Sequence, residues 1–181
     1  MFRQLPQRLA LLLCLCGVLS AAAAGSGIWL DVPFVPQEKN GCGAAVISML
    51  LRYWHSQMDS SPAQIQNALY SRKAHGIFAS DVQRYFQEHG FRAFAFAGRW
   101  DDLRQHLEKG RPLIVALKPA RLEDELHYVV VVGLEPVQNV VLVNDPAQRK
   151  LLKQERSAFE KQWSAVGNWT LLVVPEASAP R

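Results

Sequence analysis

Apolar residues recur with two different periods along the chain, and the period changes near residue 111. Before that point most apolar residues lie three or four positions apart, which is typical of amphipathic helices; the predicted helices are residues 42–54, 63–70, 80–89 and 100–109. After it, short runs rich in valine and leucine predict strands at residues 113–117, 127–134, 140–143 and 169–174. The pattern predicts an α+β domain whose helical N-terminal half packs on an antiparallel β-sheet.

Several shorter segments refine this division. Residues 91–97 alternate phenylalanine with small or polar residues and predict a strand inside the helical half. Residues 28–35 contain a proline and predict an extended lead-in rather than a central strand. Ser80 is the predicted cap of the helix that follows it, and Gly90 its predicted end. A capping-box sequence at Ser157 predicts the start of one more short helix.

Residues 1–24 have the composition of a secretory signal peptide. Arg3 and Arg8 form a basic start, an apolar run follows, and Ala22 and Ala24 form an A-x-A cleavage site. The apolar run is shorter than the roughly 20 residues of a membrane span. The chain is therefore expected to be exported to the periplasm or the extracellular space, with an uncleaved membrane anchor as the alternative.

The remaining chain, residues 25–175, is long enough for one domain with a sizeable core, and residues 176–181 are predicted to form a disordered tail. Without the two arginines of the signal peptide the formal net charge falls from +4 to +2, and no block of like charges remains. Neither a nucleic-acid partner nor an integral membrane domain in the mature chain is expected.

Cys42 is the only thiol left after the predicted cleavage, because Cys14 and Cys16 belong to the signal peptide. Each of those two follows a leucine, which does not fit a lipidation site. An unpaired thiol in an oxidising compartment indicates reactivity or intermolecular pairing. Cys42 lies between two glycines at the start of a predicted helix, where unpaired N–H groups favour a thiolate. The alternative is a small buried hydrophobic residue at a tight turn.

A thiolate nucleophile needs a histidine to move its proton. Three of the five histidines lie in polar helices or loops, and His55 lies about 20 Å along the first helix from Cys42. His127 differs because it opens the most hydrophobic strand, which would hold its ring rigidly. The alternative for His127 is a strand-edge histidine bonded to water. The helices around residues 63–109 are expected to cover the resulting site.

Asp145 is the candidate that would orient His127. If the strands at 127–134 and 140–143 form a hairpin, the end of the second lies beside the start of the first. That topology places Asp145 next to His127, while the neighbouring Asn144 is a weaker candidate. The alternative for Asp145 is an Asp-Pro turn that ends a strand, and both interpretations can hold together.

Acyl transfer also needs hydrogen-bond donors for the developing oxyanion. The backbone N–H of Cys42 and the side-chain amide of Gln37 are candidates, and the alternative for Gln37 is an exposed loop residue. The mature sequence contains no His-x-x-x-His or paired-cysteine spacing. Neither a metal nor a cofactor is therefore expected.

Taken in order along the chain, the motifs are Gln37, Cys42-Gly43, His127-Tyr128 and Asn144-Asp145-Pro146. Over residues 31–174 this set resembles the double-glycine leader peptidases, papain-like cysteine peptidases best known as N-terminal domains of bacteriocin-exporting ABC transporters. The resemblance implies a papain-like fold with Cys42 as nucleophile and His127 as general base. It also implies Asp145 as the orienting residue and Gln37 as the oxyanion donor.

The predicted export and the absence of fused transporter domains depart from that family pattern. The expected substrate is therefore a peptide or an exported protein, and cleavage after Gly-Gly stays open. Two other functions stay open as well. One is an amidase or acyltransferase that acts on envelope peptides, and the other is a module that binds a Gly-rich peptide without cutting it.

Overall fold

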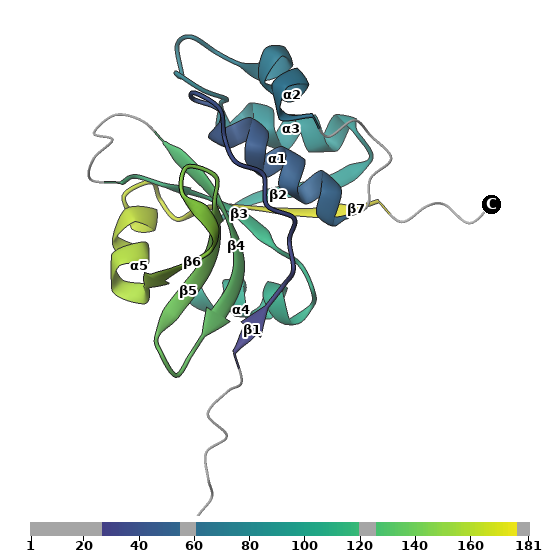
Figure 1. Ribbon diagram of the computed structural model, residues 1–181. Helices are drawn as coiled ribbons and strands as arrows, with labels where there is room; N and C mark the ends of the chain where they lie inside the picture. The colour runs from purple at the N-terminus through teal and green to yellow at the C-terminus, as the bar shows by residue number, and fades with distance from the viewer. Residues whose placement is uncertain (1–26, 55–60, 120–125, 177–181) are drawn as a thin grey trace, which may run out of the picture.

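The structure, a computed structural model, describes residues 27–54, 61–119 and 126–176 (Figure 1). The predicted signal peptide, His55 and residues 177–181 of the predicted tail lie outside these ranges. The described helices are α1 (Cys42–Tyr53), α2 (Pro62–Leu69), α3 (Ala79–Glu88), α4 (Trp100–Glu108) and α5 (Arg156–Ser164). The described strands are β1 (Ile28–Trp29), β2 (Phe91–Ala97), β3 (Leu113–Leu117), β4 (His127–Glu135), β5 (Val140–Asp145), β6 (Arg149–Glu155) and β7 (Trp169–Pro175).

The described strands form one seven-stranded sheet in the order β2-β7-β3-β4-β5-β6, with β1 paired to β4. Each of these pairings is antiparallel. The predicted α+β class with an antiparallel sheet is therefore confirmed. The division into a helical half and a sheet half holds only in part, because β1 and β2 come from the first half and α5 from the second.

Helices cover both faces of the sheet. The core on one face contains side chains of α1 and α3, and the core on the other contains those of α4 and α5 (Figure 1). The valine run of β4 supplies both cores, since Val130 and Val132 join the first and Val129 and Val131 the second. The expectation that residues 100–109 cover the site is therefore wrong, because α4 lies on the face opposite α1.

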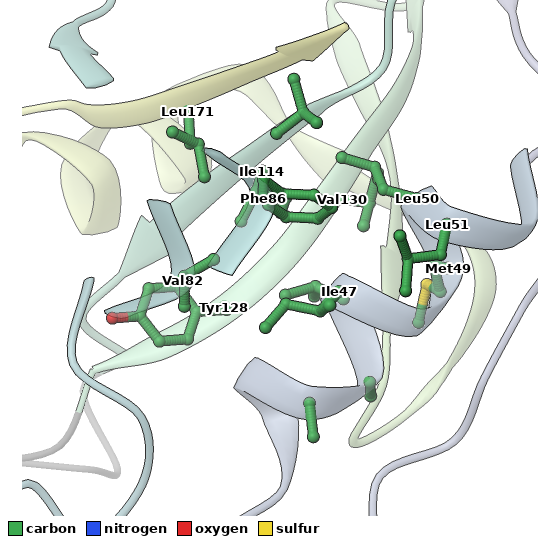
Figure 2. Packing of buried hydrophobic residues seen from close by; sticks show 14 of the residues in the cluster. Ile47, Met49, Leu50, Leu51, Val82, Phe86, Ile114, Tyr128, Val130 and Leu171 are labelled. Carbon is green, nitrogen blue, oxygen red and sulfur yellow. The ribbon is translucent and has the colours of Figure 1, made fainter. Parts of the chain in front are cut away.

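The central helix α1 is apolar on almost every side, and residues 43–51 are all buried. A helix that is hydrophobic all round must pack within the core rather than on the surface. Figure 2 shows Ile47 and Leu50 of α1 in one cluster with Val130 of β4 and Phe86 of α3. This packing holds the start of α1 next to the start of β4.

Two predicted helix starts and one strand differ from the structure. Helix α3 begins at Ala79 with Phe78 as its N-cap, so Ser80 is not the cap. Helix α5 follows β6 directly with Glu155 as its N-cap, so the predicted capping box at Ser157 does not form. Strand β6 was not predicted, because its largely polar sequence lies at the exposed edge of the sheet. No helix within the described ranges is both long and apolar enough to cross a bilayer.

Candidate active site

Cys42 is the first residue of α1, and the residue before it, Gly41, is the N-cap. Gly41 has no side chain to bond the first N–H groups of the helix, and no side-chain cap is present. Those N–H groups therefore remain available to an anion at this end of the helix. The thiol is free and half-buried. The positive end of the α1 dipole therefore acts on the sulfur, while a substrate can still reach it.

His127 is the first residue of β4 and is only 7% exposed. Its Nε2 lies 2.7 Å from Oδ1 of Asp145. The Cys42 side chain lines the same cavity as His127 and contributes to the upward shift of its pKa, and since Nε2 is engaged by Asp145, Nδ1 is the ring atom left to face the sulfur. The structure thus brings the thiol, the imidazole and the carboxylate together, with the imidazole hydrogen-bonded to the carboxylate.

Asp145 reaches His127 because β4 and β5 form the antiparallel hairpin that the sequence predicts. Val130 pairs with Asn144, so the end of β5 lies beside the start of β4. Asp145 is 2% exposed, and its carboxylate also accepts hydrogen bonds from the Ala147 N–H at 2.9 Å and the Gln148 side-chain amide at 2.6 Å. A carboxylate buried this deeply is tolerated because donors surround it.

The two buried groups shift each other's pKa in opposite directions. Burial lowers the pKa of His127, but hydrogen bonds and attraction to Asp145 and Cys42 outweigh it and raise the pKa to about 9. Burial raises the pKa of Asp145, but hydrogen bonds from His127, Ala147 and Gln148 outweigh it and hold the pKa below its usual value. Near neutral pH the pair is therefore an imidazolium and a carboxylate.

Gln37 lines the same cavity as Cys42 and His127. Its backbone N–H donates to Pro146 O at 2.9 Å, which ties the segment before α1 to the turn after β5. Its side-chain Oε1 is buried and has no hydrogen-bond partner within the described ranges. The unpaired atom is an acceptor, so the oxyanion role predicted for Gln37 depends on its Nε2 instead.

The cavity has a volume of about 690 Å³, and one wall consists of residues 73–79. Tyr128 ties this wall to β4 through a hydrogen bond from its hydroxyl to Ile77 O at 3.2 Å. Gly43 allows the wall to approach α1, because a Cβ at that position would lie 3.0 Å from the Ile77 Cβ. Phe78 and Leu126 line the cavity and expose large apolar side chains.

Sequence reasoning missed this wall. Lys73 and His75 both line the cavity, although the sequence places them in a polar loop with no chemical signal of their own. The other rejected candidates lie elsewhere: His89 is exposed at the end of α3, and His106 is half-buried on α4. Asn144 is fully buried and donates to Val32 O at 3.1 Å rather than contacting His127.

Nothing in the described ranges groups three or more His, Cys, Asp or Glu side chains closely enough to hold a metal ion. A thiol beside an imidazolium can become a thiolate nucleophile, and the same imidazole can return the proton to a leaving group. These residues form a candidate site for thiol-based acyl transfer, carried by a mixed helix and antiparallel-sheet fold.

The comparisons with known proteins give the family. The model of the Peptidase_C39 like family matches residues 29–171, so the chain belongs to this family of peptide-bond hydrolases. The predicted family resemblance and enzyme class are therefore confirmed. No curated protein sequence matches the chain.

Solved structures share the fold at low sequence identity. A crystal structure described as a C39-like peptidase from Bacillus anthracis has a TM-score of 0.68 and 17% identity, covering 85% of this chain and 100% of that one. A double-glycine motif protease from an AMS/PCAT transporter, in complex with the leader peptide, has a TM-score of 0.63 and 22% identity over 81% and 94%. The peptidase domain of Streptococcus ComA, a bifunctional ABC transporter involved in quorum sensing, has a TM-score of 0.63 and 19% identity over 79% and 98%.

Proposed function

We propose that this chain is an exported cysteine peptidase that hydrolyses a peptide bond with Cys42 as nucleophile, His127 as acid and base, and Asp145 as the orienting residue. The observation that carries the proposal is the set formed by the free thiol of Cys42 and, beside it, the buried hydrogen-bonded pair His127–Asp145. This set opens into a cavity large enough for several residues of an extended peptide.

In the first half of the reaction, the Cys42 thiolate attacks the carbonyl carbon and a C–S bond forms. The carbonyl oxygen becomes an oxyanion, for which the Cys42 N–H and the Gln37 amide are the proposed donors. The His127 imidazolium gives its Nδ1 proton to the nitrogen of the leaving amine. The C–N bond then breaks and leaves a thioester on Cys42.

In the second half, neutral His127 takes a proton from water while the water oxygen attacks the thioester. The C–S bond breaks, the carboxylic acid product leaves, and the thiolate and imidazolium form again. Throughout, Asp145 keeps Nε2 protonated so that Nδ1 exchanges the proton with Cys42, the leaving amine and water.

For the substrate we propose a peptide or an exported protein. One structural neighbour is in complex with a leader peptide, and the cavity here is lined by Cys42, His127 and the wall at residues 73–79. A peptide with Gly-Gly before the scissile bond is the first candidate, because the wall lies so close to α1 that a Cβ on Gly43 would meet Ile77, which favours substrate residues without side chains.

The test compares the wild type with Cys42→Ala on a set of peptides that carry Gly-Gly or other sequences at the centre. Mass spectrometry should find cleavage at one defined bond with the wild type only. An added amine separates peptidases from acyltransferases, because an acyltransferase would form the amide product rather than the acid. Equal biological activity of Cys42→Ala would contradict catalysis and support a binding module. Comparing exported proteins from cells with and without Cys42 would then identify the natural substrate.

A further inference from the structure

Asp145 uses both carboxylate oxygens, and only one of them faces His127. Oδ1 accepts from His127 Nε2 at 2.7 Å and from the Ala147 N–H at 2.9 Å. Oδ2 accepts from Gln148 Nε2 at 2.6 Å. The side-chain amide of Gln148 thus donates a hydrogen bond to the carboxylate oxygen that His127 does not contact.

These hydrogen bonds restrict how the carboxylate can turn. The torsion at the end of an aspartate side chain is broad, and the bonds from His127 and Ala147 both meet Oδ1. A further bond at the opposite oxygen fixes the plane of the carboxylate. The orientation of the His127 ring depends on that plane, because Nε2 is bonded to Oδ1.

We propose that Gln148 is a positioning residue of the peptidase, which holds Oδ2 of Asp145 so that Oδ1 stays directed at His127. The inference rests on the proposed function, because it requires that His127 acts on Cys42. Nothing in the sequence motifs points to Gln148, which lies in the turn after β5 and is exposed at its surface.

The position requires a hydrogen-bond donor. A lysine would also donate to Oδ2 and keep Asp145 ionised, whereas an apolar side chain would leave Oδ2 without this partner. Along β6, Arg149 lies opposite Asp145 in the strand register yet forms no ion pair with it in the described part of the chain. The next residue, Lys150, pairs with Asp31 instead.

Lys73, His75 and Tyr128 line the cavity beside Cys42 and His127, and all three are the same in every variant compared below. His127 of β4 is the titratable group that contacts Asp145 from another element, and Cys42 of α1 faces His127 in turn. A change at Gln148 should reach the thiol only through Asp145 and His127. The effect can then be read at Cys42 without knowledge of the substrate.

The experiment measures the rate of alkylation of Cys42 by iodoacetamide in the full chain as a function of pH. In Gln148→Leu the carboxylate loses a donor, so it protonates at higher pH and its hold on His127 weakens. The acid limb of the profile, where the alkylation rate rises with pH, should move to a pH about half a unit higher. At a fixed acidic pH the alkylation rate should therefore fall about threefold. Gln148→Lys keeps a donor and should leave the acid limb at or below its position in the wild type.

Gln138→Leu is the matched control, because Gln138 is an exposed glutamine at the other end of β5 that accepts from Lys153 at 3.1 Å. Asp145→Asn is the reference for a lost carboxylate. An acid limb in Gln148→Leu that coincides with that of Gln138→Leu would overturn the proposal, and so would equal shifts in the Leu and Lys variants. If Asp145→Asn leaves the limb in place as well, the proposed triad fails, and not only the role of Gln148.

Discussion

Two hollows of similar volume differ in what lines them. The cavity beside Cys42 measures about 690 Å³ and the one between α4 and α5 about 720 Å³. The second is lined by arginines that form exposed ion pairs, such as Arg156 with Glu160 at 2.9 Å, where both side chains are more than a third exposed. The first contains the pair His127–Asp145, whose side chains are 9% and 3% exposed.

This difference shows that volume does not identify the reactive site. Exposed ion pairs are screened by water and contribute about 0–1 kcal/mol, so the arginines of the second hollow have ordinary surface chemistry. Buried partners interact strongly and shift each other's pKa, as His127 and Asp145 do. The buried pair, with a thiol beside it, makes the first hollow the candidate active site.

The largest expected effect is on the rate of peptide cleavage, and it should differ between the two hollows. His127 lines the first hollow and Arg156 lines the second. His127→Ala should lower peptide cleavage by about 10³-fold or more, because the thiolate loses its counter-ion and the leaving amine its proton donor. Arg156→Ala should leave cleavage within about twofold of the wild type. Rates on a cleaved peptide provide the measurement, and comparable losses in both variants would remove the distinction between the hollows.

A smaller effect concerns stability and pH. The pKa of His127 is raised to about 9 in the folded chain, against about 6.5 in the unfolded chain. The folded state therefore binds more protons between these values, so the stabilisation is complete below about pH 6.5 and is lost as the pH rises towards 9. The unfolding free energy should fall by about 1–3 kcal/mol over this window.

Chemical unfolding at a series of pH values measures this loss. His127→Ala should flatten the curve between pH 6.5 and 9, since the titrating group is absent. Arg156→Ala should keep the slope of the wild type. An unchanged slope in His127→Ala would mean that another group controls stability in this range.

The smallest effect is expected in the second hollow itself. Arg156 lies 4.3 Å from the centre of the Trp100 ring and pairs with Glu160. Both interactions are exposed, so Arg156→Ala should lower the unfolding free energy by only about 1 kcal/mol or less. Repeating the unfolding in high salt should reduce the difference further, whereas a loss of several kcal/mol would show that this hollow is also built on a buried interaction.

Much of the fold could be predicted because local patterns report burial directly. The strand at 91–97 and the strand at 113–117 were predicted with the bounds that the structure has. Strand β6 was missed because an edge strand needs only one neighbour and can be polar. The side of the sheet that α4 covers could not be predicted either, since an apolar helix face does not specify which sheet face it meets.

The candidate site divides in a similar way. Residue type, a helix start and a hairpin restrict where each side chain can lie. The sequence was therefore enough to select Cys42, His127 and Asp145 as candidates. Their catalytic roles, and that of Gln37, stay predictions for the experiments above. Gln148 and the wall at residues 73–79 could not be selected, because their importance depends on contacts between segments distant in sequence or on the exact shape of a turn.

The amino-acid sequence was sufficient to specify the α+β class, the hairpin that carries His127 and Asp145, and the family resemblance. These depend on periodicity, turn chemistry and the order of motifs, which act over short stretches of chain. The depth at which the His127–Asp145 pair is buried, the wall tied to β4 by Tyr128, and the contrast between the two hollows came only with the tertiary structure. Burial and pKa depend on every segment that surrounds a group, and only packing determines which segments those are.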